Sequence, residues 1–281
     1  MNPTVTILVD DQRGETDAVA EHGFSALVET ENASILFDTG QTGTALSHNA
    51  RLLGVNMAAI SVVVLSHGHY DHTGGLPEAF HRRTDLPLFL HPDAVQPRYS
   101  VRTNAPPKPV GMSDECVRLI RQLGSRAHWT TAPTEIAQGV WATGAIPRRN
   151  AFEDTGGSFF MDPDCQTPDV LNDDQALWFN TREGIVILLG CAHAGVVNTL
   201  DYVAQTIGIR RVHAVIGGMH LRAADENRLR FTVSALQRYE VQLIAPCHCT
   251  GKEAMTHLAE HTGKTYKSCS IGERFVWAPP G

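Results

Sequence analysis

Apolar residues recur along the chain in short runs, separated by segments rich in Gly, Asp and Asn. Near the N-terminus, the runs at residues 4–9, 24–29 and 34–37 are rich in β-forming residues and predict strands. Apolar positions with helical spacing follow at 44–53. The continuous apolar run at 62–65 predicts a central strand that is buried on both faces.

The C-terminal half alternates between strand and helix patterns, and no Gly/Ser-rich linker separates it from the first half. We therefore expect one domain spanning residues 1–281, an α/β fold in which sheet packs on sheet with helices outside. The elements expected in this half are a hairpin of strands at 176–180 and 185–189, helices at 196–206, 225–239 and 252–261, and strands at 211–216 and 241–245.

A proline-rich segment interrupts the pattern near residues 92–112. Its prolines cannot lie inside a helix or a central strand, so we expect a long loop inserted into the domain. The loop carries Arg98, Arg102 and Lys108, with Asp93 as its only acid. Two interpretations stay open: a solvated surface excursion, or a binding loop that holds an anionic group.

The composition is typical of a globular protein. Of 281 residues, 42% are hydrophobic and 19% are charged, which excludes disorder. The net charge of −7 disfavours a nucleic-acid partner. Apolar runs are strand-sized, so no membrane contact is expected. The six cysteines form no repeated framework and the chain starts without a secretory pattern, so we expect reduced thiols and a cytoplasmic location.

Three histidines and one aspartate lie in the six-residue segment HGHYDH at 67–72, between a buried strand and a Gly-Gly pair. In a tight loop His67 and His69 can direct their imidazoles to one point. Asp71 and His72 then turn toward a second point a few ångströms away. This spacing supplies ligands for two adjacent cations, the arrangement used in metal-assisted hydrolysis. Imidazole with carboxylate suits zinc, manganese or iron better than calcium or magnesium.

Further ligands are expected at other strand ends, because a metal site needs donors from more than one loop. His193 and His248 each follow a predicted strand, and we expect both as ligands; His220 follows a third, and its role stays open. Cys247 and Cys249 flank His248. On a strand-like backbone they would point away from it, which favours buried thiols over a thiolate site. The other histidines are expected in surface or structural roles: His22, His48, His81, His91, His128, His213, His257 and His261.

The HGHYDH segment, preceded by FDTG at 37–40, resembles the motif of the metallo-β-lactamase superfamily. The finer resemblance is to a subgroup related to the 7,8-dihydropterin-6-yl-methyl-4-(β-D-ribofuranosyl)aminobenzene 5′-phosphate synthases. The segments that carry the finer resemblance are FDTG at 37–40, TGAIPR at 143–148 with FE at 152–153, GCAH at 190–193, GGMHL at 217–221 and HCTG at 248–251.

The resemblance implies a four-layer αβ/βα sandwich with two divalent metal ions at one edge, zinc first, with manganese or iron as alternatives. It assigns Asp38 to orient a ligand imidazole, and Cys191 is expected just behind the ligands. Many members of the superfamily also have a Gly-Asp whose aspartate bridges both metals, and no such carboxylate is evident here. An alternative is therefore that one of the two metal sites binds its ion tightly and the other binds it weakly. The implied ligands are His67, His69 and His193 for one cation and Asp71, His72 and His248 for the other.

The resulting functional hypothesis is a metal-dependent hydrolase of a small anionic ester or phosphoester. Asp71 and His220 are the expected catalytic residues, with His220 steadying the developing oxyanion or protonating the leaving group. Arg148 and Arg149, with the basic residues of the loop, would hold the anionic group. Two alternatives stay open. One is a transferase that condenses a dihydropterin pyrophosphate with a ribofuranosylaminobenzene phosphate, and the other is a non-catalytic metal-containing binding protein. The expected partner is a small molecule, and assembly as a homodimer is left open.

Overall fold

The apolar runs of the N-terminal half pair into one sheet, in the order β16-β1-β2-β3-β4-β5-β8. Its first strands form an antiparallel meander, and from β3 onward the neighbours run parallel. The computed structural model describes residues 2–14, 17–81, 83–102 and 104–281. The strands are β1 (Thr4–Val9), β2 (Ser25–Glu29), β3 (Ser34–Phe37), β4 (Val62–Val64), β5 (Leu88–Leu90), β8 (Ala127–Trp129) and β16 (Arg274–Val276).

A second sheet has the order β15-β14-β13-β12-β10-β9. Here too the strands start antiparallel, and β13, β14 and β15 run parallel because a helix follows each of them. The strands are β9 (Thr134–Ala137), β10 (Val140–Ala142), β12 (Leu177–Thr181), β13 (Gly184–Leu189), β14 (Ala214–Gly218) and β15 (Leu243–Cys247).

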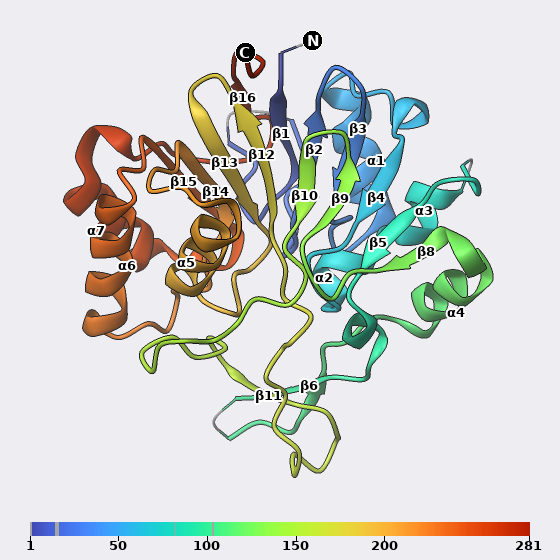
Figure 1. The fold of residues 1–281 in the computed structure, drawn as a ribbon. Helices are drawn as coiled ribbons and strands as arrows, with labels where there is room; N and C mark the ends of the chain where they lie inside the picture. Colours follow the sequence, from blue (N-terminus) through green and yellow to red (C-terminus); the bar gives the residue numbers. More distant parts are fainter. Residues whose placement is uncertain (1, 15–16, 82, 103) are drawn as a thin grey trace.

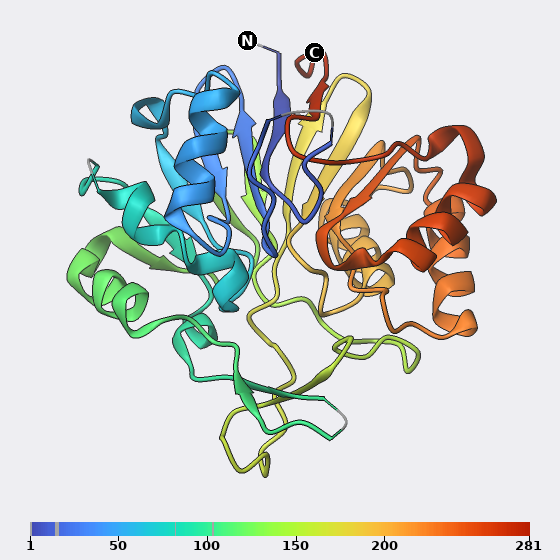
Figure 2. The same cartoon turned by 180° about the vertical axis from the view of Figure 1, so that it is seen from behind.

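Helices cover the outer face of each sheet, which gives four layers (Figures 1 and 2). This confirms the expected α/β sandwich. Polar side chains start several of the helices: Thr42 accepts a hydrogen bond from Ala45 N at 3.1 Å, and Asp225 accepts one from Arg228 N at 2.8 Å. The helices are α1 (Gly43–Leu52), α2 (Tyr70–Thr73), α3 (Leu76–Phe80) and α4 (Asp114–Leu123) on the first sheet, and α5 (Val196–Ile207), α6 (Glu226–Arg238) and α7 (Lys252–Thr262) on the second.

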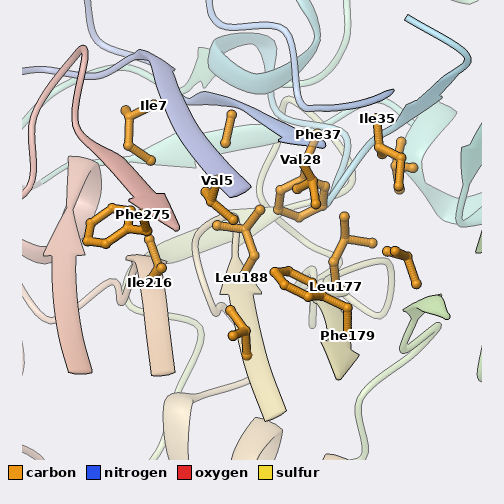
Figure 3. Close-up of a cluster of buried hydrophobic side chains, with 14 of the residues drawn as sticks. Val5, Ile7, Val28, Ile35, Phe37, Leu177, Phe179, Leu188, Ile216 and Phe275 are labelled. Carbon is orange, nitrogen blue, oxygen red and sulfur yellow. The ribbon is translucent and has the colours of Figure 1, made fainter. Parts of the chain in front are cut away.

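The main core lies between the two sheets (Figure 3). Alternate residues of each strand point into it, so Val62 and Val64 belong to this core while Val63 packs under the helices on the other face. The expected central strand at 62–65 is therefore buried on both faces. From the second sheet, Leu177 and Leu188 complete the packing.

The proline-rich segment 92–112 packs against the first sheet through Ala94, extends below the four layers, and contains regular structure where a long loop was expected. It begins with a 3₁₀ turn, Pro92–Val95, and continues into β6 (Tyr99–Val101) and β7 (Lys108–Pro109). A distant segment, β11 (Ser158–Phe160), pairs with β6 to make a small antiparallel sheet. Figure 1 shows β6 and β11 beneath the edge where both main sheets end.

The elements expected from the sequence pattern are present with boundary shifts of at most three residues. The short strands β5, β8, β9, β10 and β16 and the helix α4 were not anticipated. No helix in the described part of the chain is both long and apolar enough to cross a membrane.

Candidate metal centre

The carboxyl ends of strands from both sheets meet at one edge of the sandwich, and polar side chains follow each of them. In the first sheet, β1 leads to Asp10, β3 to Asp38 and β4 to His67. In the second, β13 leads to His193 and β15 to His248. The site is therefore assembled from loops that are far apart in the sequence.

His67, His69 and His193 form one group, called here the first triplet. One ligand atom from each lies within 4.8 Å of the others. The ring nitrogens His67 Nε2 and His69 Nδ1 are 3.0 Å apart. His69 Nε2 and His193 Nε2 are buried and have no hydrogen-bond partner. Buried imidazole nitrogens without a partner are costly, and a cation bound by His193 Nε2 would remove that cost at this atom.

Asp71, His72 and His248 form the second triplet, again with ligand atoms within 4.8 Å of one another. His72 Nε2 lies 3.2 Å from His248 Nε2, and the latter lies 3.4 Å from the carboxylate oxygen Asp71 Oδ2. The two triplets are adjacent, since the rings of His67 and His72 are 4.2 Å apart between centroids. The structure thus brings together the six residues that the sequence singled out as ligands.

Buried acceptors fix the orientation of these imidazoles. Asp38 lies 2.7 Å from His72 Nδ1, and it also accepts hydrogen bonds from the backbone N–H and the hydroxyl of Ser66, both at 2.6 Å. His193 Nδ1 donates to the carbonyl of Thr155 at 2.7 Å. Each contact occupies the ring nitrogen that faces away from the cluster, so the other nitrogen is free for a cation.

Asp11 and His22 extend the second triplet, and the sequence reasoning missed both. Asp11 Oδ1 lies 2.8 Å from His248 Nδ1, while its other oxygen lies 3.1 Å from His22 Nδ1. His22 Nε2 in turn lies 3.4 Å from Asp71 Oδ2. The Asp10-Asp11 pair directly after an apolar strand was a visible signal for this edge, whereas nothing in the pattern around His22 indicates its position.

Burial sets the protonation of the first triplet. It lowers the pKa of His67, His69 and His193 well below the ordinary value, and neighbouring positive groups add to the shift. Their imidazoles are therefore neutral at pH 7, the form that binds metal ions. Burial opposes ionisation of Asp71, but His72 and His248 lower the pKa of its carboxyl below the ordinary value.

A cavity of about 790 Å³ opens over the two triplets. His69, Asp71, His193 and His248 form part of its floor, and its walls come from the small sheet of β6, β7 and β11 and from the loop after β14. His220 lies in this cavity with its ring centroid 4.3 Å from that of His193. Burial lowers the pKa of His220, and its Nδ1 atom has no hydrogen-bond partner.

Two of the five basic residues expected to hold an anionic group line this cavity. These are Arg102 and Lys108, and the Lys108 ammonium lies 5.1 Å from the centre of the Tyr70 ring. Arg222 also lines the cavity, although no pattern in the sequence indicated it. Phe159 adds an aromatic wall, with its ring centroid 5.0 Å from that of His69.

Arg98, in contrast, is turned away from solvent and does not line the cavity. Its guanidinium pairs with Asp173 at 2.6 Å and with Asp169 at 2.7 Å. Asp173 also accepts a hydrogen bond from Gly68 N at 2.7 Å. The carbonyl of Asp93 accepts a further hydrogen bond from the guanidinium at 3.1 Å. Arg98 therefore supports the 67–69 loop from behind and is not free to bind an anion.

Arg148 and Arg149 also lie outside the cavity, contrary to expectation. Arg148 donates to the carbonyl of Val170 at 2.8 Å, and Arg149 pairs with Gln205 on α5. These contacts hold both side chains away from the cavity. Their position next to a subgroup motif was a poor guide to where the side chains point.

Cys191 and Cys249 lie closer to the triplets than expected. Cys191 Sγ is 3.1 Å from His72 Nε2, and Cys191, His248 and Cys249 offer ligand atoms within 4.8 Å of one another. The expectation that Cys249 points away assumed that the strand continues. Instead the backbone turns at His248, with φ of 50°, into the 3₁₀ turn His248–Thr250, and this turn brings Cys249 into the cavity.

Comparison with known proteins agrees with this geometry. The sequence model of the metallo-β-lactamase superfamily matches residues 19–99, which include the HGHYDH segment. An uncharacterized protein of Methanocaldococcus jannaschii is 31% identical, with 93% of this chain and 96% of that protein covered. The chain belongs to the metallo-β-lactamase superfamily.

Further relatives lie within the same superfamily. A protein of Methanocaldococcus jannaschii named 7,8-dihydropterin-6-methyl-4-(β-D-ribofuranosyl)-aminobenzene-5′-phosphate synthase is 29% identical, with 97% of this chain and 96% of that protein covered. The crystal structure of Tm1679, described as a metal-dependent hydrolase of the β-lactamase superfamily, superposes with a TM-score of 0.81 at 28% identity. The superposition covers 97% of this chain and 98% of that one. YhfI of Bacillus subtilis, at 14% identity and a TM-score of 0.59, shares the fold.

Proposed function

We propose that this metallo-β-lactamase superfamily protein is a metal-dependent hydrolase of small anionic esters or phosphoesters. The observation that carries the proposal is the pair of adjacent triplets at the floor of a cavity whose wall is basic. The residues fit divalent cations, because the buried Nε2 atom of His193 has no other partner and imidazole with carboxylate is a donor set for zinc, manganese or iron. We propose zinc, with one ion at each triplet.

The roles of the side chains follow from their positions. The first triplet would hold one cation and the second triplet would hold the other. Bound divalent cations supply Lewis acidity and activate water at neutral pH. Asp38 keeps the His72 ring in the orientation in which Nε2 faces the cluster.

His220 and the cavity wall would act on the substrate. His220 faces the cavity beside His193, where the N–H of its neutral ring can donate a hydrogen bond to the developing oxyanion. Proton transfer to the leaving group would need the imidazolium form, which burial disfavours. Lys108, Arg102 and Arg222 line the wall of the same cavity, so they would hold an anionic group of the substrate. Phe159 offers a flat apolar surface for the remainder of the substrate.

Metal analysis combined with a substrate screen tests this function. Protein purified without added metal should carry divalent ions, and His67→Ala and His248→Ala should each lose metal together with hydrolysis of bis(p-nitrophenyl) phosphate. His81→Ala is the matched control, because His81 is exposed and lies outside the cavity. Wild-type metal content in both site variants would refute the ligand assignment. Full metal content without turnover of phosphodiesters, lactones or thioesters would favour a non-catalytic binding protein.

A second candidate is the synthase reaction. The near full-length similarity to the protein named as a dihydropterin synthase favours it, as does an aromatic wall beside basic residues, which suits a planar pterin and a phosphate. Incubation with the dihydropterin pyrophosphate and the aminobenzene ribotide separates the two reactions, because a condensation product and a hydrolysis product differ in mass. We also propose a reducing compartment such as the cytoplasm, since the cysteines are free thiols.

A further inference from the structure

Among the described residues, no carboxylate belongs to a ligand cluster that joins the two triplets. Gly190 and Gly218 stand at the strand ends that approach this position, and neither has a side chain. There is no space for one, since a Cβ at Gly190 would lie 2.1 Å from Ser66 Oγ and a Cβ at Gly218 would lie 2.3 Å from the Gly190 carbonyl. The close approach of these backbones leaves the next side chain, Cys191, facing the centre.

Cys191 Sγ occupies the space between the triplets. It lies 3.1 Å from His72 Nε2, and it shares one 4.8 Å cluster with His67 and His72 and another with His248 and Cys249. The sulfur is therefore near a member of the first triplet and two members of the second. Two ligand atoms on one tetrahedral zinc ion are about 3.5 Å apart, given Zn–S and Zn–N bonds of about 2.3 and 2.0 Å. The distance to His72 is close to this value.

The surroundings favour sulfur as a ligand. Cys191 is 2% exposed, and the backbone on either side is held by hydrogen bonds from Gly218 N to Gly190 O and from Ala194 N to Asp174. A thiol loses its proton when a metal binds, and the resulting thiolate binds zinc, iron and cobalt strongly. The thiol of Cys249 is less well placed, because it lies 3.8 Å from the Cys191 carbonyl and joins a cluster only with Cys191 and His248.

We propose that Cys191 is itself a metal ligand, whose sulfur would join His72 and His248 in holding the cation of the second triplet. The proposal rests on the proposed metal centre and adds a thiolate to its donor set. On metal binding, the Cys191 S–H proton leaves to solvent and a metal–sulfur bond forms, with no change in oxidation state.

Cobalt substitution tests this assignment without relying on activity. Metal-free protein titrated with Co²⁺ should develop the near-ultraviolet absorption of sulfur-to-cobalt charge transfer as the second equivalent binds. The Cys191→Ser variant should lose this absorption. Cys249→Ser and Cys116→Ser, which remove other buried thiols, should retain it.

The Cys191→Asp variant separates ligand loss from misfolding. A carboxylate at this position should keep two cobalt ions bound per chain while the charge-transfer band disappears. The thiolate assignment would be wrong if the wild type bound cobalt without the charge-transfer band. It would also be wrong if Cys249→Ser removed the band and Cys191→Ser did not. Neither result would contradict the metal centre itself. Failure of the wild type to bind cobalt at all would overturn the metal centre as well.

Discussion

Arg98 and Lys108 lie in the same basic segment but differ in burial and in their partners. Arg98 is fully paired with buried carboxylates, whereas Lys108 is exposed and lines the cavity. A charged side chain on a loop can serve either purpose, and its partners decide which. Here the partners of Arg98 are Asp169 and Asp173, which lie about 70 residues away in the chain.

This difference yields a prediction at the residue scale. Arg102→Ala and Lys108→Ala should each raise KM for bis(p-nitrophenyl) phosphate about five-fold, the equivalent of ~1 kcal/mol, because each removes a positive charge from the cavity wall. Arg149→Ala should leave KM unchanged, since Arg149 pairs with Gln205 outside the cavity. Steady-state kinetics of the metal-loaded proteins measure this. An equal effect of all three substitutions would show that net charge matters and position does not.

At the scale of elements, the start of α5 is held by a side chain from a remote loop. Glu153 is buried and accepts hydrogen bonds from the backbone N–H groups of Val197 and Asn198, both at 2.8 Å. Gly195 precedes this helix with φ of 105°, and a Cβ there would lie 2.2 Å from the Glu153 carboxyl carbon. Only glycine lets the carboxylate approach the helix end this closely. The contact fixes the direction of the chain just after His193.

The protonation of Glu153 should make stability depend on pH. Burial raises the pKa of Glu153 above its ordinary value of 4.5, although hydrogen bonds from Asn150 and the helix oppose the shift. As pH rises past 4.5, the unfolded chain releases this proton before the folded chain does, so the free energy of unfolding falls. The decline ends once pH exceeds the raised folded-state pKa.

We therefore expect the free energy of unfolding of the wild type, minus that of Glu153→Gln, to decrease between pH 4 and pH 7. The glutamine cannot titrate, so the difference isolates this one group. Urea unfolding of both proteins across the pH range measures it. A difference that stays constant or grows with pH would contradict the assigned direction of the shift.

At the scale of the whole molecule, the candidate metal centre joins the two halves of the sandwich. Its ligands follow β4 in the first sheet and β13 and β15 in the second, so a bound cation would link both sheets at one edge. Ions that bind only the folded state stabilise it by mass action. Metal binding and global stability should then be coupled.

Removal of metal should consequently destabilise the entire fold. With free zinc about 100-fold above its Kd, the melting temperature should rise about 5–10 °C over that of chelator-treated protein. His193→Ala should lose most of this increase, because it removes the first triplet's ligand from the second sheet. His81→Ala should retain it. Thermal scans monitored by circular dichroism are sufficient, and an increase that survives in His193→Ala would argue against a link between the sheets.

The sequence by itself determined most of the local structure and pointed to the cluster of candidate ligands. A continuous apolar run such as 62–65 follows from burial on two faces, and a cluster of three imidazoles and a carboxylate in six residues is informative without coordinates. Strands of three residues such as β5 and β8 escaped prediction, because so short a run carries no periodicity and forms only when a neighbouring strand supplies hydrogen bonds.

Tertiary structure alone decided which distant groups meet. Asp11 and His22 joined the second triplet, Cys191 came between the triplets, and Arg98 turned inward to carboxylates. Each of these outcomes depends on the direction of a side chain at a strand end, and that direction is set by a few backbone angles, such as the positive φ at His248. Local propensity does not encode those angles, since they are imposed by the packing of one sheet against the other.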